Sequence, residues 1–414
     1  MQRMQPEPIY LDNNSTTRLA PAALEAMAAA AREFPGNPAS QHAAGRLARR
    51  HLDELRERLA AHLGVNVTRR PEDEIVFTSG ATEANNLALR GLLGPAPSRL
   101  LVSAIEHPSV LEVVDQLAAA GHDVVRLPVD ERGVVALDVL AAQLKTPTRL
   151  VSVMLGNHET GVRQPLGEIA ELCRDAGALL HTDASQAVAK TRVHFGELGV
   201  HALTLSAHKF HGPCGVGALV LAAGVRPLPM LVGGAQQAGL RAGTESVALP
   251  AGLVAALDAV LAVEGVKTEG DAYREVEAKL ARLRDAFEAE LVAAQPEIVI
   301  LGADAERLPQ TSCVAFEPLE RQALFLALDL AGVACSTGSA CESGSSEPSP
   351  VLRAMGLREG QISSALRFSL SRLTTPAETA SAARRILRVY NDLRHRFEAT
   401  KSAVPATGKT WKKV

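Results

Sequence analysis

The chain has 414 residues, with 43 lysines and arginines against 46 acidic residues and a formal charge of −3. This balance gives no electrostatic field that would gather nucleic acid or an anionic lipid surface, so we expect small molecules and proteins as partners. Hydrophobic residues make up 47% and aromatic residues 3%, which is typical of helices packed on a Val/Leu-rich sheet. The first residues lack the apolar stretch of a signal peptide, and no run approaches the roughly 18 apolar residues of a membrane span, so we expect a cytoplasmic protein.

From about residue 20 to about residue 250, short apolar runs alternate with amphipathic segments of helix length. This rhythm is typical of a parallel sheet covered by helices on both faces. It predicts an α/β protein whose large domain contains a mainly parallel, seven-stranded sheet. The predicted strands are 74–78, 99–104, 123–129, 149–155, 178–183, 202–207 and 215–221.

The second part of the chain predicts a smaller α+β domain. Two apolar stripes within 251–293 indicate helices, with a break near 267–271. Further strands are expected at 297–301, 312–316 and 365–370, with helices near 319–330 and 376–395. We therefore predict a large domain over residues 16–260, a small domain formed by 1–15 and 261–400, and a flexible tail at 401–414.

Polar motifs follow directly on the predicted strands, at the edge where open parallel sheets bind ligands. Pyridoxal phosphate needs an amine for its aldehyde, an acid beside its ring nitrogen, donors for its phosphate and a flat group over its ring. Lys209 in SAHKFHGP offers the amine, and Asp183 at the end of ALLHTD offers the acid. The turn at Gly80 leads into a helix whose free N–H groups, with the Thr82 hydroxyl, suit a phosphate, and His107 before a proline offers the flat group.

Each of these residues also has an ordinary structural interpretation. A lone lysine is usually a solvated surface residue, and Asp183 would serve equally well as the N-cap of a helix. His208, His211 and Cys214 have a spacing that suggests metal ligands, but the Gly-Pro turn among them opposes convergence on one ion, so we expect no metal site. The combination of residues, rather than any one of them, favours the cofactor.

The segment CSTGSACESGSSEPS, residues 335–349, carries Cys341 within a run of small, polar residues. A thiol on such an arm can reach a substrate sulfur, take it up as a persulfide and carry it to an acceptor. Basic residues do not flank Cys341, so we expect its activation to come from the site itself, with His107 as the candidate base. Arg367, in the expected strand ALRFSL, is a candidate for binding a substrate carboxylate through two parallel hydrogen bonds.

The five cysteines are scattered without paired spacing, which fits reduced thiols rather than a disulfide framework. Cys173 lies on the apolar face of a predicted helix, and Cys313 lies in a predicted strand. We expect both in the core.

Together these motifs resemble the cysteine desulfurases of the class V aminotransferases, which have the fold type I architecture of pyridoxal-phosphate enzymes. The resemblance runs from YLDNNSTT at 10–17 to RFSLSRLTT at 367–375 and includes SGATEANN, EHPSV, HTDASQ, SAHKFHGP and STGSAC. It implies conversion of L-cysteine to L-alanine, with the sulfur held as an enzyme persulfide and passed to an acceptor protein in iron–sulfur cluster or thio-cofactor assembly. A selenocysteine lyase or an aminotransferase is the alternative, and a non-catalytic scaffold that keeps only the fold is a third interpretation.

The same resemblance assigns roles to residues. Lys209 would form the Schiff base, Cys341 would carry the persulfide, and Lys209 and His107 would move protons. Cofactor contacts are implied for Ala81, Thr82, His107, His158, Asp183, Gln186, Ser206, His208, Lys209 and Thr244.

More specific contacts follow from the family pattern. Gln186 would bind the phenolate oxygen of the cofactor, Ser206 and His208 its phosphate, and Arg367 the carboxylate of the substrate. Family members are homodimers whose phosphate site receives a residue from the partner subunit, and Thr244 in RAGTES matches that residue.

The chain departs from the family pattern at several positions. His158 stands where a second asparagine is usual, Cys214 where a lysine is common, and Ser15 where an alanine is usual. GGAQQ at 233–237 replaces the usual GGGQE. None of these changes affects Lys209, Asp183 or Cys341.

Overall fold

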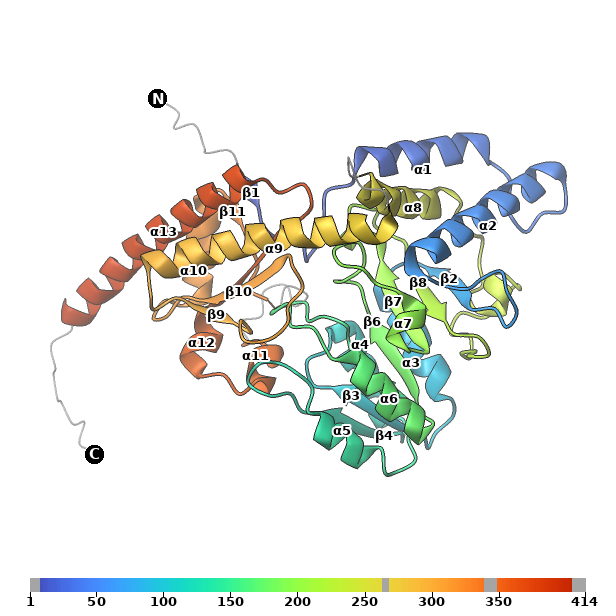
Figure 1. Ribbon diagram of the computed structural model, residues 1–414, viewed down its shortest axis with the longest axis horizontal. Helices are drawn as coiled ribbons and strands as arrows, with labels where there is room; N and C mark the ends of the chain where they lie inside the picture. Colours follow the sequence, from blue (N-terminus) through green and yellow to red (C-terminus); the bar gives the residue numbers. More distant parts are fainter. Residues whose placement is uncertain (1–7, 263–267, 339–347, 404–414) are drawn as a thin grey trace, which may run out of the picture.

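The computed structural model describes residues 8–262, 268–338 and 348–403. A seven-stranded sheet forms the centre of the larger part of the molecule (Figure 1). Its strands, in spatial order, are β2 (Glu74–Thr78), β8 (Gly217–Leu221), β7 (Ala202–Ser206), β6 (Leu179–Asp183), β5 (Leu150–Ser152), β3 (Arg99–Ser103) and β4 (Asp123–Leu127). The predicted α/β class with a mainly parallel seven-stranded sheet is confirmed.

One strand of this sheet runs against the others. β8 pairs antiparallel with both β2 and β7, whereas β7, β6, β5, β3 and β4 pair in parallel. The connection from β7 to β8 spans only residues 207–216, which is too short for the crossover that a parallel neighbour requires.

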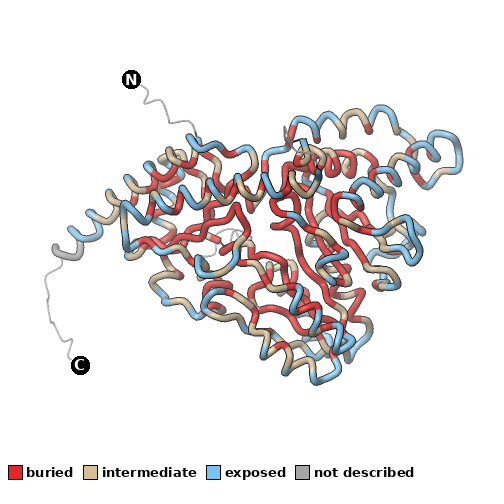
Figure 2. The backbone as a smooth tube through the Cα atoms, viewed as in Figure 1, coloured by how far each residue is buried: buried red, intermediate tan, exposed pale blue. Residues whose placement is uncertain are grey.

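Helices cover both faces of the sheet because its strands are apolar on both sides. Leu100 and Val102 of β3 pack with Leu87 and Val110 in one buried cluster, while Leu101 belongs to the cluster on the opposite face. Helices α3 (Ala81–Leu93) and α4 (Pro108–Ala119) contribute to the first cluster. Helices α5 (Leu137–Gln143), α6 (Leu166–Ala176) and α7 (Phe195–Leu198) contribute to the cluster on the opposite face. Figure 2 shows the strands as buried backbone beneath more exposed helices.

Three further helices pack together beside the sheet: α1 (Pro21–Glu33), α2 (Ala43–Leu63) and α8 (Ala248–Leu261). The 26-residue helix α9 (Glu269–Ala294) then runs across to the smaller part of the molecule (Figure 1). Among the helices that the structure describes, none combines the length and apolar character needed to cross a membrane.

The smaller part contains a three-stranded antiparallel sheet with β10 at its centre. A short parallel pair, β1 with β11, joins the N-terminal residues to this part, as expected. The elements are β1 (Ile9–Tyr10), β9 (Val299–Leu301), β10 (Thr311–Ala315), α10 (Arg321–Leu330), β11 (Val333–Ala334), α11 (Pro350–Ala354), α12 (Glu359–Ser364), β12 (Ala365–Ser369) and α13 (Pro376–Ala403). The last helix ends eight residues beyond its predicted end, and the domain boundaries stay a prediction.

A histidine is completely buried in the middle of the large sheet. His181 of β6 contacts the Ser152 hydroxyl through Nδ1 at 2.9 Å and the Thr204 hydroxyl through Nε2 at 3.1 Å. Burial disfavours the imidazolium and lowers the pKa of His181 to about 4, although the nearby carboxylate of Asp183 opposes the shift. The sheet therefore contains a neutral imidazole that binds protons less readily than it does in the unfolded chain.

We predict that the free energy of unfolding decreases as the pH falls from 6.5 to 4, because the unfolded state takes up the proton that folded His181 resists. The pKa difference corresponds to at most about 3 kcal/mol for this residue. Urea titrations at several pH values should show a shallower decrease for His181→Gln, which keeps polar atoms but does not titrate. Equal pH slopes for the two proteins would contradict the assignment.

Candidate active site

The amine of Lys209 lies at the carboxyl end of the large sheet. Lys209 ends a single 3-10 turn, η1 (Ala207–Lys209), that follows directly on β7. Its Nζ donates hydrogen bonds to the backbone oxygens of Asn14 at 2.6 Å and Ser15 at 2.8 Å. The chain then folds back so closely that a Cβ on Gly212 would lie 2.8 Å from the Cβ of Ala207. The Gly-Pro turn therefore returns the backbone sharply and leaves the amine at the strand end.

Two adjoining cavities meet at this amine. The first has a volume of about 470 Å³ and includes Asp183, and we call it the Asp183 cavity. The second has a volume of about 450 Å³ and includes Arg367, and we call it the Arg367 cavity. Both are lined by Ser15, His107, His158, Gln186 and Lys209. The structure thus offers two compartments with one lysine between them.

Asp183 ends β6 and presents a fixed carboxylate to its cavity. Oδ2 accepts a hydrogen bond from Nδ2 of Asn85 at 2.8 Å, and Oδ1 accepts one from the backbone N–H of Ser185 at 2.9 Å. Asn85 is itself held by the Ser109 hydroxyl at 2.9 Å. These contacts fix the orientation of the carboxyl group.

The other wall of the Asp183 cavity is the start of α3. Gly80, Ala81 and Thr82 line the cavity at this helix N-terminus, and the helix has no side-chain cap at Gly80. Ser206 and His208 line the same cavity. An uncapped helix start with hydroxyl groups beside it suits a phosphate, because its N–H groups and the helix dipole favour negative charge.

His107 and His158 lie between the compartments with ring centroids 5.2 Å apart in an edge-on arrangement. The Nδ1 of His107 accepts a hydrogen bond from the backbone N–H of Ser109 at 3.1 Å, so a neutral ring carries its proton on Nε2. Burial lowers the pKa of His107, with Lys209 and Arg367 acting in the same direction and Asp183 opposing. Burial also holds the pKa of His158 well below its ordinary value. The buried Nδ1 of His158 has no partner among the described residues.

An acid that the sequence analysis did not single out also lines the Arg367 cavity. Glu106 is 1% exposed, and burial raises its pKa to about 8. Its Oε1 accepts hydrogen bonds from the Ser103 hydroxyl and from the backbone N–H of Met154, while Oε2 is buried without a partner in the described part of the chain. The sequence signal was an acid that directly follows the apolar run RLLVSAI and precedes His107.

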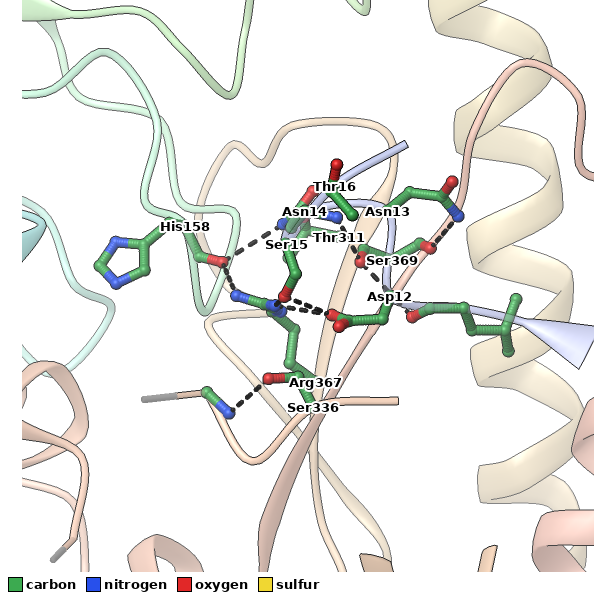
Figure 3. Close-up of polar contacts among 12 residues, drawn as sticks. Asp12, Asn13, Asn14, Ser15, Thr16, His158, Thr311, Ser336, Arg367 and Ser369 are labelled. Carbon is green, nitrogen blue, oxygen red and sulfur yellow. Dashed lines mark hydrogen bonds and ion pairs between the residues drawn. The ribbon is translucent and has the colours of Figure 1, made fainter. Parts of the chain in front are cut away.

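Arg367 joins the smaller part of the molecule to the N-terminal segment. Its guanidinium donates to Oδ1 of Asp12 at 2.8 Å, to the Ser15 hydroxyl at 2.8 Å and to the backbone oxygen of His158 at 3.0 Å (Figure 3). The arginine side chain is only 3% exposed and that of Asp12 is 19% exposed, so the ion pair is buried on the arginine side. The ring of His158 points away from the guanidinium in the same view. Arg367 lines its cavity, as the predicted carboxylate contact requires, but it also has a clear structural role.

The cysteines differ sharply in environment. Cys173 and Cys313 are buried, which confirms their predicted core positions, and burial raises the pKa of Cys173 to about 12. Cys335 is also buried. Cys214 is exposed and lines the Asp183 cavity. Cys341, the predicted persulfide carrier, lies outside the described residues.

The remaining predicted contacts divide by location. Ala81, Thr82, Asp183, Ser206 and His208 line the Asp183 cavity only, whereas His107, His158, Gln186 and Lys209 line both cavities. Thr244 is exposed and does not line either cavity. This position agrees with the expectation that Thr244 serves a partner subunit, which stays a prediction.

The fold and motifs correspond to a known family. The model of the class-V aminotransferases matches residues 9–380, and the chain belongs to this family. A cysteine desulfurase from Cereibacter sphaeroides is 44% identical over 375 residues, which cover 90% of this chain and 93% of that protein. The cysteine desulfurase NifS of Azotobacter vinelandii is 40% identical over 390 residues, covering 94% of each. The X-ray structure of a NifS-like protein from Rickettsia africae superposes with a TM-score of 0.81 at 28% identity, covering 93% of this chain and 100% of that chain.

We predict that Arg367→Ala lowers the free energy of unfolding by about 3–5 kcal/mol, because it leaves the Asp12 carboxylate without its buried partner. Arg358→Ala is the matched control, since Arg358 pairs with Glu317 on the surface with 69% of its side chain exposed. The control should lose less than about 1 kcal/mol. Urea denaturation of both variants measures the difference, and similar losses would argue against a structural role for the buried pair.

Proposed function

We propose that this protein is a pyridoxal-phosphate-dependent cysteine desulfurase that converts L-cysteine to L-alanine and passes the sulfur to an acceptor protein through a persulfide on Cys341. The observation that carries the proposal is one amine, Lys209, placed between a compartment with a fixed carboxylate and a compartment with a buried arginine. The kinship with cysteine desulfurases at 40–44% identity supports the same activity.

The residues of the Asp183 cavity fit the cofactor in charge and position. The carboxylate of Asp183 suits a protonated ring nitrogen, and the uncapped start of α3 with Ser206 suits the phosphate. Gln186 suits the oxygen on the ring, as does the buried Nδ1 of His158, for which the described residues provide no partner. When bound to Lys209, pyridoxal phosphate supplies an electron-withdrawing ring that weakens the bonds at the α-carbon of an attached amino acid.

The Arg367 cavity fits a small amino acid. The guanidinium can meet a carboxylate there, and its buried Nε has no partner in the described part of the chain. Neutral His107 at the boundary can accept a proton from a substrate thiol or return one, because its lowered pKa keeps the ring uncharged at neutral pH. Lys209 is the second group placed to move a proton at the α-carbon.

We further propose that the protein acts as a homodimer. The segment 228–232 exposes four apolar side chains, with Leu228 59%, Met230 37%, Leu231 44% and Val232 83% exposed. Such a cluster on the surface suits contact with a second copy of the chain, and exposed Thr244 lies nearby in the sequence. In that arrangement Thr244 would complete the phosphate site of the partner. The sulfur acceptor is a protein that docks where Cys341 can reach it.

The roles of the Cys341 thiol and the Lys209 amine can be separated by mutation. Purified wild-type protein with pyridoxal phosphate should show the absorbance band of a lysine-bound cofactor and should release alanine and sulfide in equal amounts from L-cysteine and a reductant. Lys209→Ala should lose the band. Cys341→Ser should keep the band but lose at least about 99% of sulfide release, because it lacks the nucleophile that takes the sulfur.

Cys214→Ser is the matched control, since Cys214 is an exposed thiol that lines the Asp183 cavity. It should keep most of the activity. Turnover in Cys341→Ser equal to wild type would contradict the proposal. 3-Mercaptopyruvate, with the amino group transferred to the cofactor, would instead indicate an aminotransferase, and a protein that never binds the cofactor would indicate a scaffold.

A further inference from the structure

A second lysine is buried behind the active site. Lys190 is 5% exposed and follows Asp183 by seven residues, after the turns that continue from β6. Ammonium groups are rarely buried so completely without partners, because removal from water is costly. The surroundings of Lys190 must therefore compensate for its burial.

The backbone at this position is strained in a way that places the side chain. Ala189 has a φ of 67°, in the left-handed region that alanine rarely adopts. The next two backbone N–H groups, of Lys190 and Thr191, both bond to the oxygen of Ala187, at 3.0 and 3.1 Å. Such a conformation persists only where the surrounding structure enforces it, and it is common at functional sites.

The amine of Lys190 holds one residue that lines both cavities. Its Nζ donates to the backbone oxygen of Gln186 at 3.2 Å and to the side-chain Oε1 of Gln186 at 3.1 Å. Gln310 donates to the same backbone oxygen at 3.0 Å. Because the amine donates to Oε1, the amide nitrogen of Gln186 must point the other way.

The amide nitrogen of Gln186 leads on to the catalytic amine. Nε2 donates to the backbone oxygen of Asn14 at 2.9 Å, and that oxygen also accepts from Lys209. One hydrogen-bonded chain thus runs from Lys190 through Gln186 and Asn14 to Lys209. A cavity of about 10 Å³ touches both lysines. Burial, together with the charges of Lys209 and Arg367, holds the pKa of Lys190 well below its ordinary value.

We propose that Lys190 is a positioning residue for the cofactor: it fixes the Gln186 amide with its nitrogen on the cavity side, where an N–H group can bind the anionic oxygen on the pyridoxal ring. The inference rests on the proposed function, since it names how this chain orients one contact to that cofactor. An amide nitrogen carries two hydrogens and Asn14 takes one, so the second is available to a ligand. Without Lys190 only the bond from Nε2 to Asn14 would oppose a turn of the amide that brings its oxygen towards the same anion, which repels it.

The test uses the full-length protein loaded with pyridoxal phosphate. It measures the rate of cofactor release in the presence of a large excess of another apoenzyme that captures the free cofactor. Lys190→Met should release it about tenfold faster, equivalent to about 1.4 kcal/mol, the size expected for one hydrogen bond to a charged acceptor. Lys190→Leu is a second apolar replacement with the same expected result. Lys190→Arg, which keeps N–H donors, should stay within about twofold of wild type. Lys145→Met is the surface control and should leave the rate unchanged.

The decisive comparison is a double-mutant cycle with Gln186→Met. If Lys190 acts through Gln186, Lys190→Met should add little to the release rate once Gln186 is already replaced. If the two substitutions raise the release rate independently, so that their fold-changes multiply in the double variant, Lys190 has a general packing role and the proposal is overturned. A wild-type release rate in Lys190→Met would also overturn it. The absorbance band of the bound cofactor provides a second readout: its pH midpoint should shift in Lys190→Met and in Gln186→Met alike.

The outcomes separate this inference from the proposed function. Wild-type protein that does not bind pyridoxal phosphate overturns both. Wild-type binding with unchanged release in the Lys190 variants overturns this inference alone and leaves the proposed function intact.

Discussion

The buried guanidinium of Arg367 connects the three segments on which the site depends. It bonds to Asp12 and Ser15 of the N-terminal segment and to the backbone of His158 in a turn that follows β5 of the large sheet, while its own strand belongs to the smaller part of the molecule. The N-terminal segment is also fixed by the Asn14 side chain, which donates to the Thr311 hydroxyl at 2.9 Å. Because Asn14 and Ser15 supply the two carbonyls that hold the Lys209 amine, the ion pair determines where that amine lies. A residue suited to substrate binding is therefore also part of the scaffold.

The charge distribution around Lys209 favours anionic ligands. Lys209 and Arg367 both lower the pKa values of the neighbouring His107 and His158, and burial acts more strongly in the same direction. The imidazoles are thus uncharged at neutral pH, and the carboxyl group of Asp183 is held in the first cavity by its hydrogen bonds. A buried arginine and a half-buried lysine beside neutral donors suit a phosphate, a ring oxygen and a carboxylate, each of which would gain strong hydrogen bonds there. Neutral imidazole also leaves His107 able to accept a proton, which a permanently charged group could not do.

Much of this arrangement could be predicted from the sequence, because apolar strands end in polar motifs and such ends converge at one edge of a parallel sheet. Asp183, His107 and Lys209 do line one cavity in the structure, while their roles stay a prediction. The direction of β8 was not predicted, although the short connection before it already requires an antiparallel strand. The pair β1 and β11 could not be found, because its two-residue strands carry no periodic pattern. Lys190 was missed because nothing in QAVAKT distinguishes a buried amine from a solvated one; its burial follows from the strained turn at Ala189.

The central claim is that Lys209, and not the second buried amine, carries the cofactor. Reduction of the pyridoxal-phosphate-loaded protein with borohydride makes that attachment permanent, and peptide mass spectrometry then locates it. The account predicts a single phosphopyridoxyl group on the peptide that contains Lys209, at close to one per chain. A group on Lys190 instead, or label scattered over exposed lysines, would contradict it.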